Sequence, residues 1–537
     1  MKKIIVSIIA FSFFAVSCED FIEKEQRGTQ TLDNYFQTAT ECETYVNDLT
    51  KRLLLGDKNS WYLLLSPRIS NEMATDDAWM GNTGQDTKDY RFGAQYNITP
   101  QNMGHLSNIF SAHYYTIQSC NIGLEKMAAS PISESQRNQY MGESLFIRAY
   151  CYYELVNNFG AVPLYTKALG TSDLKLARSP AVEVYAQIEA DLKESIAKLE
   201  NITVNRNGRV NKWAANALLA RVSLFQEKWV DAKLYSDKVI SEGPYMLETN
   251  FLKIWDVNNP NGVESILAAQ SSTVQDRELG GHLATLSGAR GESKSDFPSN
   301  SDRDVLDGWG WCMPTSDLEN AYISENDVVR RRSTITKWGE AAYGDEVLNP
   351  THKFNLNDNK SGRVCRKYYI PVATRRSLEK RDGHLPLNVP LIRLAEMYLT
   401  RAEASYHLGN ETAALADINI IRARVNLNPK TGVAGPSLLK QIYKERRLEL
   451  AFEGLRLYDI RRQKDPSTGK RVIESLMGAS GTFVNYNLTS TDIYETSNLK
   501  ESQDKGINFN PIKNLLWPIP QSEIDLSGGL ISQNPNY

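Results

Sequence analysis

Two tryptophans in one short loop are the most unusual candidates for ligand contact in the sequence. Trp309 and Trp311 are separated by a single glycine in the stretch DVLDGWGWCMP, between Gly308 and Pro314. Indole rings offer flat apolar faces on which ring-shaped ligands stack, and nearby carboxylates and amides supply hydrogen bonds. If the backbone is locally extended, alternate side chains point the same way, so both indoles would form one aromatic surface. The pattern therefore predicts binding of a ligand rather than chemistry upon it.

Aromatic and acidic residues in other loop-rich stretches are further candidates for the same role. For each aromatic ring the alternative is that it packs inside its own loop. The remaining candidate ligand-binding residues are Trp79, Asp76, Asp77, Asn82, Asp304, Asp307, Trp338 and Tyr343, and Trp255 is another. Trp213 and Trp229 lie in helical patterns, and we expect them in the core.

Acidic pairs raise the alternative of hydrolytic chemistry. Asp76 with Asp77, or Asp304 with Asp307, have the residue types of the carboxylate pair of a glycosidase. Acidic clusters in polar loops are usually solvated, however, and no barrel or sandwich scaffold is indicated. The sequence lacks P-loop, GxSxG and HExxH motifs, and its six histidines are scattered. We therefore expect no enzymatic activity and no cofactor.

Composition excludes several classes of partner. The chain has 537 residues and a formal net charge of -3 at pH 7, so it lacks the basic field that nucleic-acid binding requires. Apart from Cys18, the cysteines are widely spaced, which indicates buried thiols rather than disulfides or a metal site. The stretches DVNNPNGVE and NLNDNK leave a structural calcium ion open, although neither fits an EF-hand loop.

The first residues have the pattern of a lipoprotein signal peptide. Two lysines precede an apolar run from Ile4 to Val16, shorter than the roughly 20 residues that a membrane-spanning helix needs. The residues before Cys18 complete a pattern that resembles a bacterial lipobox, whose cysteine thiol is acylated. The alternative is an ordinary secretory signal with a chance cysteine. We expect residues 1–17 to be removed and Cys18 to anchor the protein to a membrane that it does not span.

Periodicity divides the rest of the chain into two helical blocks around a loop-rich middle. After a polar linker at residues 18–35, apolar residues recur every three to four positions in residues 36–242 and again in 388–537, which predicts amphipathic helices. Residues 243–387 are dense in Gly, Asn, Ser, Asp and Pro, and so long a loop region usually carries function. A second loop insertion near residues 71–100 interrupts the first block. Short strands such as VESILAAQ and RKYYIPV could add minor β structure.

Two helix pairs resemble tetratricopeptide repeats. Small residues fall where paired helices must approach closely, and large residues fall where they fill the gaps. The helix break of the earlier pair is predicted near Glu227 and Lys228. Because the repeats are not contiguous, we predict an all-α scaffold of scattered helix pairs rather than a regular solenoid. The matching positions are Ala402, Tyr406, Gly409, Ala413 and Ile420 in the later pair and Ala217, Phe225, Trp229, Ala232 and Val239 in the earlier one.

Several motifs in the expected order resemble the SusD/RagB family of nutrient-uptake lipoproteins. They are GESLFIRAYCYYELVNNFGAVPLYT at residues 142–166, GWGWCMPTSDLENAYISENDVVRR at 308–331, IYKERRLELAFEGLRLYDIRRQ at 442–463, and the terminal PIPQSEI and QNPNY. With the lipobox, the resemblance covers essentially the whole chain.

The motifs themselves are expected to be structural. Glu445, Arg446, Glu449 and Glu453 lie at helical spacings, so they should pair with one another or with a neighbouring helix rather than catalyse. Near the C-terminus, prolines should fix an extended strap with Trp517 in the core.

The resemblance implies an all-α, tetratricopeptide-containing lipoprotein at the surface of the outer membrane, of the kind used in polysaccharide utilisation. It would capture oligosaccharides and pass them to a SusC-like, TonB-dependent transporter without chemistry on the ligand. RagB-type capture of peptides and a helical-repeat adaptor that binds only protein remain as alternatives. Sugar rings have apolar C–H faces that stack on aromatic rings and hydroxyls that bond polar groups, so the tryptophan loops are where the ligand is expected.

Overall fold

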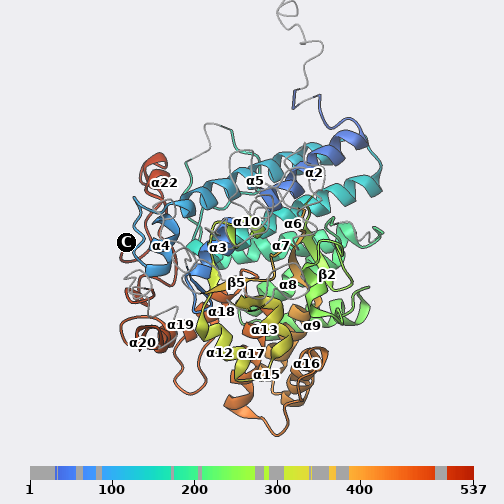
Figure 1. The fold of residues 1–537 in the computed structure, drawn as a ribbon. Coiled ribbons are helices and arrows are strands. Elements are labelled where there is room, and N and C mark those ends of the chain that lie inside the picture. Colours follow the sequence, from blue (N-terminus) through green and yellow to red (C-terminus); the bar gives the residue numbers. More distant parts are fainter. Residues whose placement is uncertain are drawn as a thin grey trace, which may run out of the picture.

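The computed structural model describes most of the chain, and its architecture is helical (Figure 1). The described residues are 31–32, 34–55, 65–79, 88–170, 175–203, 208–271, 283–288, 308–337, 340, 362–370, 386–489 and 505–537. The helices are α2 (Ala39–Leu55), α3 (Leu65–Met73), α4 (Lys88–Gln95), α5 (His105–Ala128), α6 (Glu134–Phe159), α7 (Ala181–Leu199), α8 (Lys212–Phe225), α9 (Trp229–Glu242), the 3-10 helix η3 (Phe251–Trp255), α10 (Leu283–Leu286), α12 (Ser316–Ile323), α13 (Val328–Thr334), α15 (Leu394–His407), α16 (Glu411–Arg424), α17 (Gly435–Leu450), α18 (Arg456–Arg462), α19 (Val472–Leu476), α20 (Thr482–Thr489) and α22 (Gln521–Leu526). The predicted all-α fold class is confirmed.

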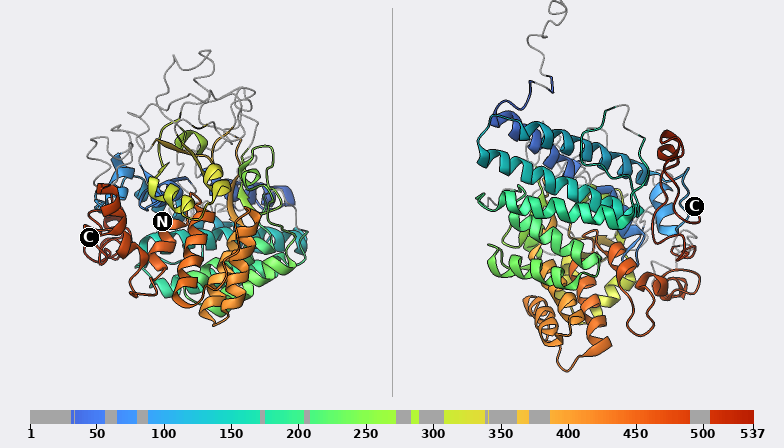
Figure 2. Two further views of the ribbon diagram at one scale, coloured as in Figure 1. Left: turned by 60° about the horizontal axis from the view of Figure 1, so that its bottom comes forward. Right: turned by 180° about the vertical axis from the view of Figure 1, so that it is seen from behind.

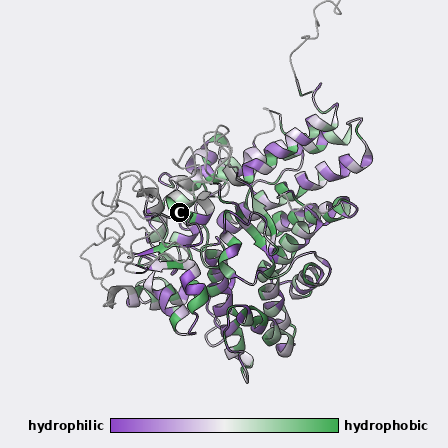
Figure 3. Ribbon diagram, turned by 45° about the vertical axis from the view of Figure 1, so that its right-hand side comes forward, coloured by the Kyte–Doolittle hydropathy of each residue, from purple (hydrophilic) through white to green (hydrophobic). Residues whose placement is uncertain are grey.

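The long helix α6 forms the centre of the first helical block. It begins with a capping box, in which Ser133 and Gln136 satisfy each other's backbone, and it ends at Gly160 with φ +73°. Between Tyr140 and Phe159 almost every residue is buried, because α5 and α7 pack along its sides. In Figure 3 hydrophilic and hydrophobic residues alternate along the helices, as expected when one face of a helix meets solvent and the other a neighbour.

The two predicted repeat pairs are helical hairpins that meet in space. The first hairpin, α8 and α9, breaks where expected, with Glu227 at φ +57°. The second, α15 and α16, is far along the chain, yet α15 packs against α9, with Leu224, Ala232 and Ala404 in one buried cluster. Figure 2 shows the orange C-terminal helices beside the green helices of the first block. Alanines at the contact allow this close approach, so the pairs continue one helical scaffold.

Apart from isolated bridges, the β structure of the described chain consists of three antiparallel two-stranded ribbons. Two of the ribbons pair the loop-rich middle with segments of the two helical blocks, and the third joins two strands within the middle itself. The pairs are β1 (Ala78–Trp79) with β3 (Met313–Pro314), β2 (Ser265–Ala269) with β6 (Val389–Arg393), and β4 (Ile335–Lys337) with β5 (Arg363–Cys365).

The acidic and basic residues of α17 and the turn after it form a buried ion-pair cluster with neighbouring elements. This confirms that they serve the fold, since their charges are matched by residues distant in sequence rather than aimed at a cavity. The pairs are Glu445 with Arg330 at 2.6 Å, Glu449 with Arg393 at 2.6 Å, Glu453 with Lys367 at 2.7 Å and Arg446 with Asp459 at 2.7 Å.

The C-terminal strap, residues 505–537, is hydrogen-bonded to the first helical block. The predicted burial of Trp517 is confirmed. The Trp517 side chain is fully buried, and its backbone N–H donates to the carbonyl of Asn158 at 2.7 Å. Asn534 crosses the same junction, because its amide donates to the carbonyls of Phe159 at 2.9 Å and Trp517 at 2.7 Å. Its side-chain oxygen accepts from Arg178.

We expect Asn534→Ala to lower the free energy of unfolding by about 2–3 kcal/mol, because the buried carbonyl of Trp517 would lose its donor and that of Phe159 would keep only the 3.4 Å contact from Arg178. Chemical denaturation measures this loss. Ser532→Ala is the matched control, since Ser532 is exposed on the same strap and its side chain can be removed at little cost. Equal stability of the two variants would contradict the role of Asn534.

Candidate functional site

The two loop-rich insertions meet at the ribbon of β1 and β3. Ala78 lies opposite Pro314 and Trp79 opposite Met313, so a segment of the first helical block pairs with the tryptophan loop. Thr315 completes the junction, because its backbone N–H donates to the carbonyl of Asp77 at 2.9 Å and its hydroxyl to that of Asp76 at 2.6 Å. We call this ribbon and residues 308–311 the loop platform.

The expectation that Asp76 and Asp77 contact a ligand is corrected by their burial. Both carboxylates are fully buried beneath the loop platform, where Arg447 lies 3.0 Å from Asp76 and 2.7 Å from Asp77. Arg456 adds a bidentate pair to Asp76 at 2.9 and 2.7 Å. Burial would raise the pKa of Asp76, but Arg447 and Arg456 hold it well below its ordinary value. These aspartates instead anchor the platform to residues 442–463, the signature segment, which contains Arg447 and Arg456.

Trp79 and Trp255 are also internal. Trp79 is 6% exposed and packs with Met313 and Val364 between the ribbons. Trp255 is buried with the ammonium of Lys367 4.3 Å from its ring centroid. Trp213 is buried as predicted, whereas Trp229, also expected in the core, is only partly buried beside one of its clusters. The expectation of ligand contact at Trp79 and Trp255 is therefore wrong, because each fills the core beneath a loop.

Trp309 and Trp311 differ in environment, which corrects the expectation of a double aromatic surface. Gly310 has φ +68°, so the stretch is not in the extended conformation that the prediction assumed. Trp311 is 6% exposed and belongs to the main core, whereas Trp309 is 36% exposed. Their ring centroids are 5.2 Å apart with planes at 61°, so the buried indole supports the exposed one edge to face.

The turn that presents Trp309 is held by close backbone contacts to the end of α10 and to the residues that follow it. Gly310 donates to the carbonyl of Gly288 at 2.9 Å, and Trp311 donates to that of Leu286 at 2.8 Å. A Cβ atom at Gly308 would lie 2.4 Å from the backbone of Gly288, so this approach requires glycine. The exposed indole is thus held by a fixed backbone.

The other sequence candidates lie outside the described residues. Cys18, Asn82, Asp304, Asp307, Trp338 and Tyr343 all belong to this set, and their roles stay predictions. Asn82 follows β1, and Asp304 and Asp307 precede the tryptophan turn, so all three are close in sequence to the platform.

The described residues form no evident metal-binding site. No cluster of three or more His, Cys, Asp or Glu side chains with suitable placement occurs among them. In the stretch DVNNPNGVE, Asp256 accepts from the backbone of Asn258 at 2.9 Å, so that carboxylate already closes a turn. The stretch NLNDNK is outside the described residues, and a structural calcium ion stays a prediction. In the part of the chain that is described, no helix is apolar over a membrane-spanning length.

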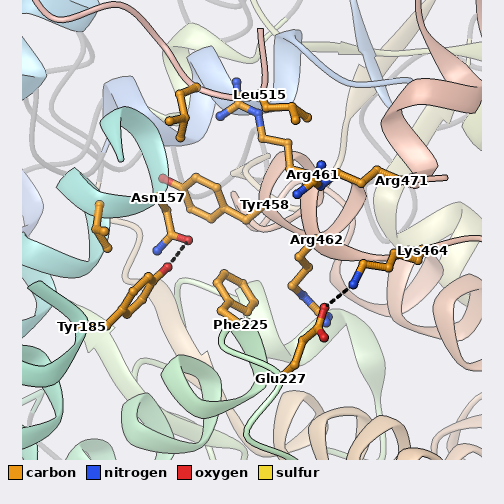
Figure 4. Close-up of a pocket in the computed structure, with 12 residues that line it drawn as sticks. Asn157, Tyr185, Phe225, Glu227, Tyr458, Arg461, Arg462, Lys464, Arg471 and Leu515 are labelled. Atoms are coloured by element: carbon orange, nitrogen blue, oxygen red, sulfur yellow. Dashed lines mark hydrogen bonds and ion pairs between the residues drawn. The ribbon is translucent and has the colours of Figure 1, made fainter. Parts of the chain in front are cut away.

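Sequence reasoning missed a pocket of about 250 Å³ between the helical block and the C-terminal strap (Figure 4). Its residues come from α6, α7, the end of α8 and the break after it, α18 and the turn from α18 to Arg471, and the strap, so no local pattern marks it. The only signal was the density of cations in YDIRRQK at residues 458–464. The lining residues are Val156, Asn157, Tyr185, Phe225, Glu227, Tyr458, Arg461, Arg462, Lys464, Arg471, Leu515 and Leu516.

Proteins of known name are similar to this chain in sequence, and solved structures are similar to it in architecture. SusD-like protein P2 of Formosa agariphila is 23% identical, with both chains covered completely. The starch-binding protein SusD of Bacteroides thetaiotaomicron is 27% identical over 72% of this chain and 76% of its own. Among solved structures, a laminarin-binding SusD-like protein superposes with a TM-score of 0.73 at 27% identity, covering 93% of this chain and 99% of that chain.

Other structural neighbours are more distant and show the fold alone. Surface glycan-binding protein A from Bacteroides thetaiotaomicron, solved in complex with laminarihexaose, has a TM-score of 0.73 at 21% identity and covers 93% of this chain and 99% of that chain.

Two family models account for most of the sequence. The model described as starch-binding associating with outer membrane matches residues 20–224. The model of the SusD family matches residues 287–537, which include the tryptophan turn, the signature segment and the C-terminal strap. The helical scaffold, the ordered motifs and these matches agree, and the chain belongs to the SusD family.

Proposed function

We propose that the protein is a non-catalytic surface lipoprotein that captures oligosaccharides, with glucans as the first class to test. The observation that carries this proposal is the half-exposed Trp309 on a rigid turn of a SusD-family scaffold. An indole held by a fixed backbone can stack on a pyranose ring with little loss of side-chain freedom. Two relatives, each 27% identical to this chain, are named for binding laminarin and starch.

Delivery to a membrane transporter is the second part of the proposal. Acylation of Cys18 would hold the protein at the outer membrane, consistent with the family description of the N-terminal match. A SusC-like, TonB-dependent barrel would then receive the captured oligosaccharide. Mass spectrometry of the membrane-extracted protein would identify the acylated cysteine.

The proposal that the protein is not an enzyme rests on the burial of Asp76 and Asp77, the acidic pair among the described residues. A glycosidase needs two carboxyl groups that flank the scissile bond, whereas Asp76 and Asp77 lie buried against arginines. Chromatography of laminarin and starch incubated with the protein should therefore show no released sugars.

The Trp309→Ala variant tests ligand capture. We expect it to weaken binding of laminarihexaose or maltohexaose about tenfold or more, by analogy with the ~1–3 kcal/mol that one aromatic stacking surface contributes to single-stranded nucleic-acid binding. Isothermal titration calorimetry measures the change, and the melting temperature should stay the same because Trp309 is partly exposed. Trp311 is unsuitable for this test, since removing a buried indole would destabilise the core.

Tyr115→Ala is the control, because Tyr115 is an exposed aromatic residue on α5, outside the loop platform. It should leave binding unchanged. Wild-type binding by Trp309→Ala would contradict the proposed site. Binding of peptides but of neither glucan would favour RagB-type capture, and binding of neither class would favour a protein adaptor.

A further inference from the structure

The pocket between α6, α7, α8, α18 and the strap is separate from the loop platform. None of its lining residues belongs to β1, β3 or the tryptophan turn. Its volume of about 250 Å³ is just below the range typical of drug-sized ligands, so it has room for a single six-membered ring with one substituent.

The lining of the pocket carries more positive than negative charge. Four of its residues are cationic and one, Glu227, is acidic. Glu227 is already paired with Lys464 at 2.9 Å. Arg462 is neutralised by two carboxylates that do not line the pocket, Glu403 at 2.6 Å and Asp459 at 2.8 Å. The excess positive charge therefore belongs to Arg461 and Arg471.

Arg461 is a buried guanidinium that no carboxylate among the described residues balances. Its Nη2 donates to the carbonyl of Asn514 at 3.2 Å, and its guanidinium lies 4.7 Å from the ring centroid of Trp517. Within the same described residues its Nε and Nη1 have no hydrogen-bond partner. Burial lowers its pKa, although nearby tyrosines raise it. A buried charge in this state is costly unless an anion accompanies it.

Arg471 is placed to meet the same anion from the rim. Its side chain is 43% exposed, and the nearest carboxylate among the described residues, Glu474, is 3.8 Å away, beyond the range of a strong charge-assisted hydrogen bond. In Figure 4 Arg461 and Arg471 lie on one side of the pocket, opposite Tyr185. Two guanidinium groups on one side suit the two oxygens of a carboxylate.

The rest of the lining suits a ring. Tyr185, Phe225 and Tyr458 supply aromatic walls, and Leu515 with Leu516 supplies an apolar edge. An anion without an apolar body would leave these surfaces uncovered, whereas a six-membered ring would contact them.

We propose that this pocket binds a ring of monosaccharide size that carries one carboxylate, with Arg461 and Arg471 holding the carboxylate. A uronic acid and a non-sugar ring acid share this chemistry. The site does not depend on the glycan capture proposed for Trp309.

Titration of the purified protein with sodium glucuronate, sodium cyclohexanecarboxylate and glucose, followed by calorimetry and saturation-transfer NMR, tests the proposal. We expect at least one of the two acids to bind and glucose not to bind at the same concentrations. Binding of glucuronate alone would identify a sugar acid, and binding of both acids a general ring carboxylate. Equal binding of glucose and glucuronate would overturn the proposal.

Arg471→Gln should weaken binding of the acid about tenfold, as expected for loss of one charge-assisted hydrogen bond, while the melting temperature stays the same. Lys193→Gln is the matched control, because Lys193 is 52% exposed and has a similarly long contact of 3.6 Å to Glu189 outside the pocket. Arg461→Met should abolish binding, and if it does not fold, Arg471→Gln still decides. Wild-type affinity in Arg471→Gln, or loss of acid binding in Trp309→Ala, would overturn the assignment.

Discussion

Glu449→Gln is expected to lower the free energy of unfolding by about 3–5 kcal/mol, the cost of breaking a buried ion pair by removing one partner. Glu449 is fully buried, and its carboxylate accepts from Arg393 at 2.6 Å, from Arg330 at 3.2 Å and from Arg424. An amide has the same shape but no charge, so the three guanidinium groups would lose part of their compensation in a site that water does not reach.

Denaturation by urea, compared between wild type and variant, measures this loss. Glu200→Gln makes the same chemical change at the surface, where Glu200 is 56% exposed and pairs with Lys212 at 2.8 Å. That control should cost less than about 1 kcal/mol. Similar losses in both variants would show that the buried cluster contributes no more than a surface pair.

The effect of Glu449 should depend on pH in a defined direction. Burial would raise its pKa, but Arg424, Arg393 and Arg330 outweigh burial and hold the pKa well below the ordinary value for glutamate. A carboxylate with a lowered folded-state pKa stabilises the protein above its unfolded pKa, and this contribution is lost as pH falls toward the folded value. The gap between wild type and Glu449→Gln should therefore be full above about pH 5 and narrow under more acidic conditions.

Local sequence patterns were sufficient for the helices and for the role of the signature segment. Spacing placed the break near Glu227 correctly, because a helix break is a local property of the chain. The same spacing indicated that Glu445 and Glu449 serve the fold, and both are matched by buried arginines. Helical periodicity shows which face of a helix is buried, even when the element that packs against this face is unknown.

The burial and the partners of the residues in and beneath the loop platform could not be predicted from local sequence patterns. Whether Trp309 or Trp311 is buried depends on the left-handed conformation of Gly310 and on contact with Gly288. The partner of Asp76 is Arg456, which lies 380 residues further along the chain. An acidic pair in a polar stretch has the same local appearance whether it faces solvent or a buried arginine.

Arg447 of α17 joins the signature segment to the loop platform. Its replacement should therefore lower both the stability of the protein and its affinity for the ligand. In Arg447→Met, Asp77 would lose its 2.7 Å partner and Asp76 its 3.0 Å contact, while Arg456 would still pair with Asp76. We expect a loss of about 3–5 kcal/mol in the free energy of unfolding at neutral pH, because the buried carboxylate of Asp77 would lose its hydrogen-bonded cation. Binding of laminarihexaose or maltohexaose should weaken as well, since the residues beside β1 support the tryptophan turn.

Acid should partly restore the stability of Arg447→Met. Burial already raises the pKa of Asp77 in the wild type, with Asp76 adding to the rise, and loss of Arg447 removes a cation that opposes it. A buried carboxyl with a raised folded-state pKa destabilises the protein while ionised and stops doing so once protonated. The deficit measured by urea denaturation should therefore be larger at pH 7.5 than at pH 5.

Adding Asp77→Asn to Arg447→Met provides the decisive control, because an amide needs no cation. The double variant should regain most of the lost stability and should lose the acid dependence that the single variant shows. If Arg447→Met is as stable as wild type, or if Asp77→Asn makes it less stable still, the aspartates do not depend on Arg447. The buried charge of Asp77 would then have to be balanced by Arg456, whose Nε is 3.8 Å away.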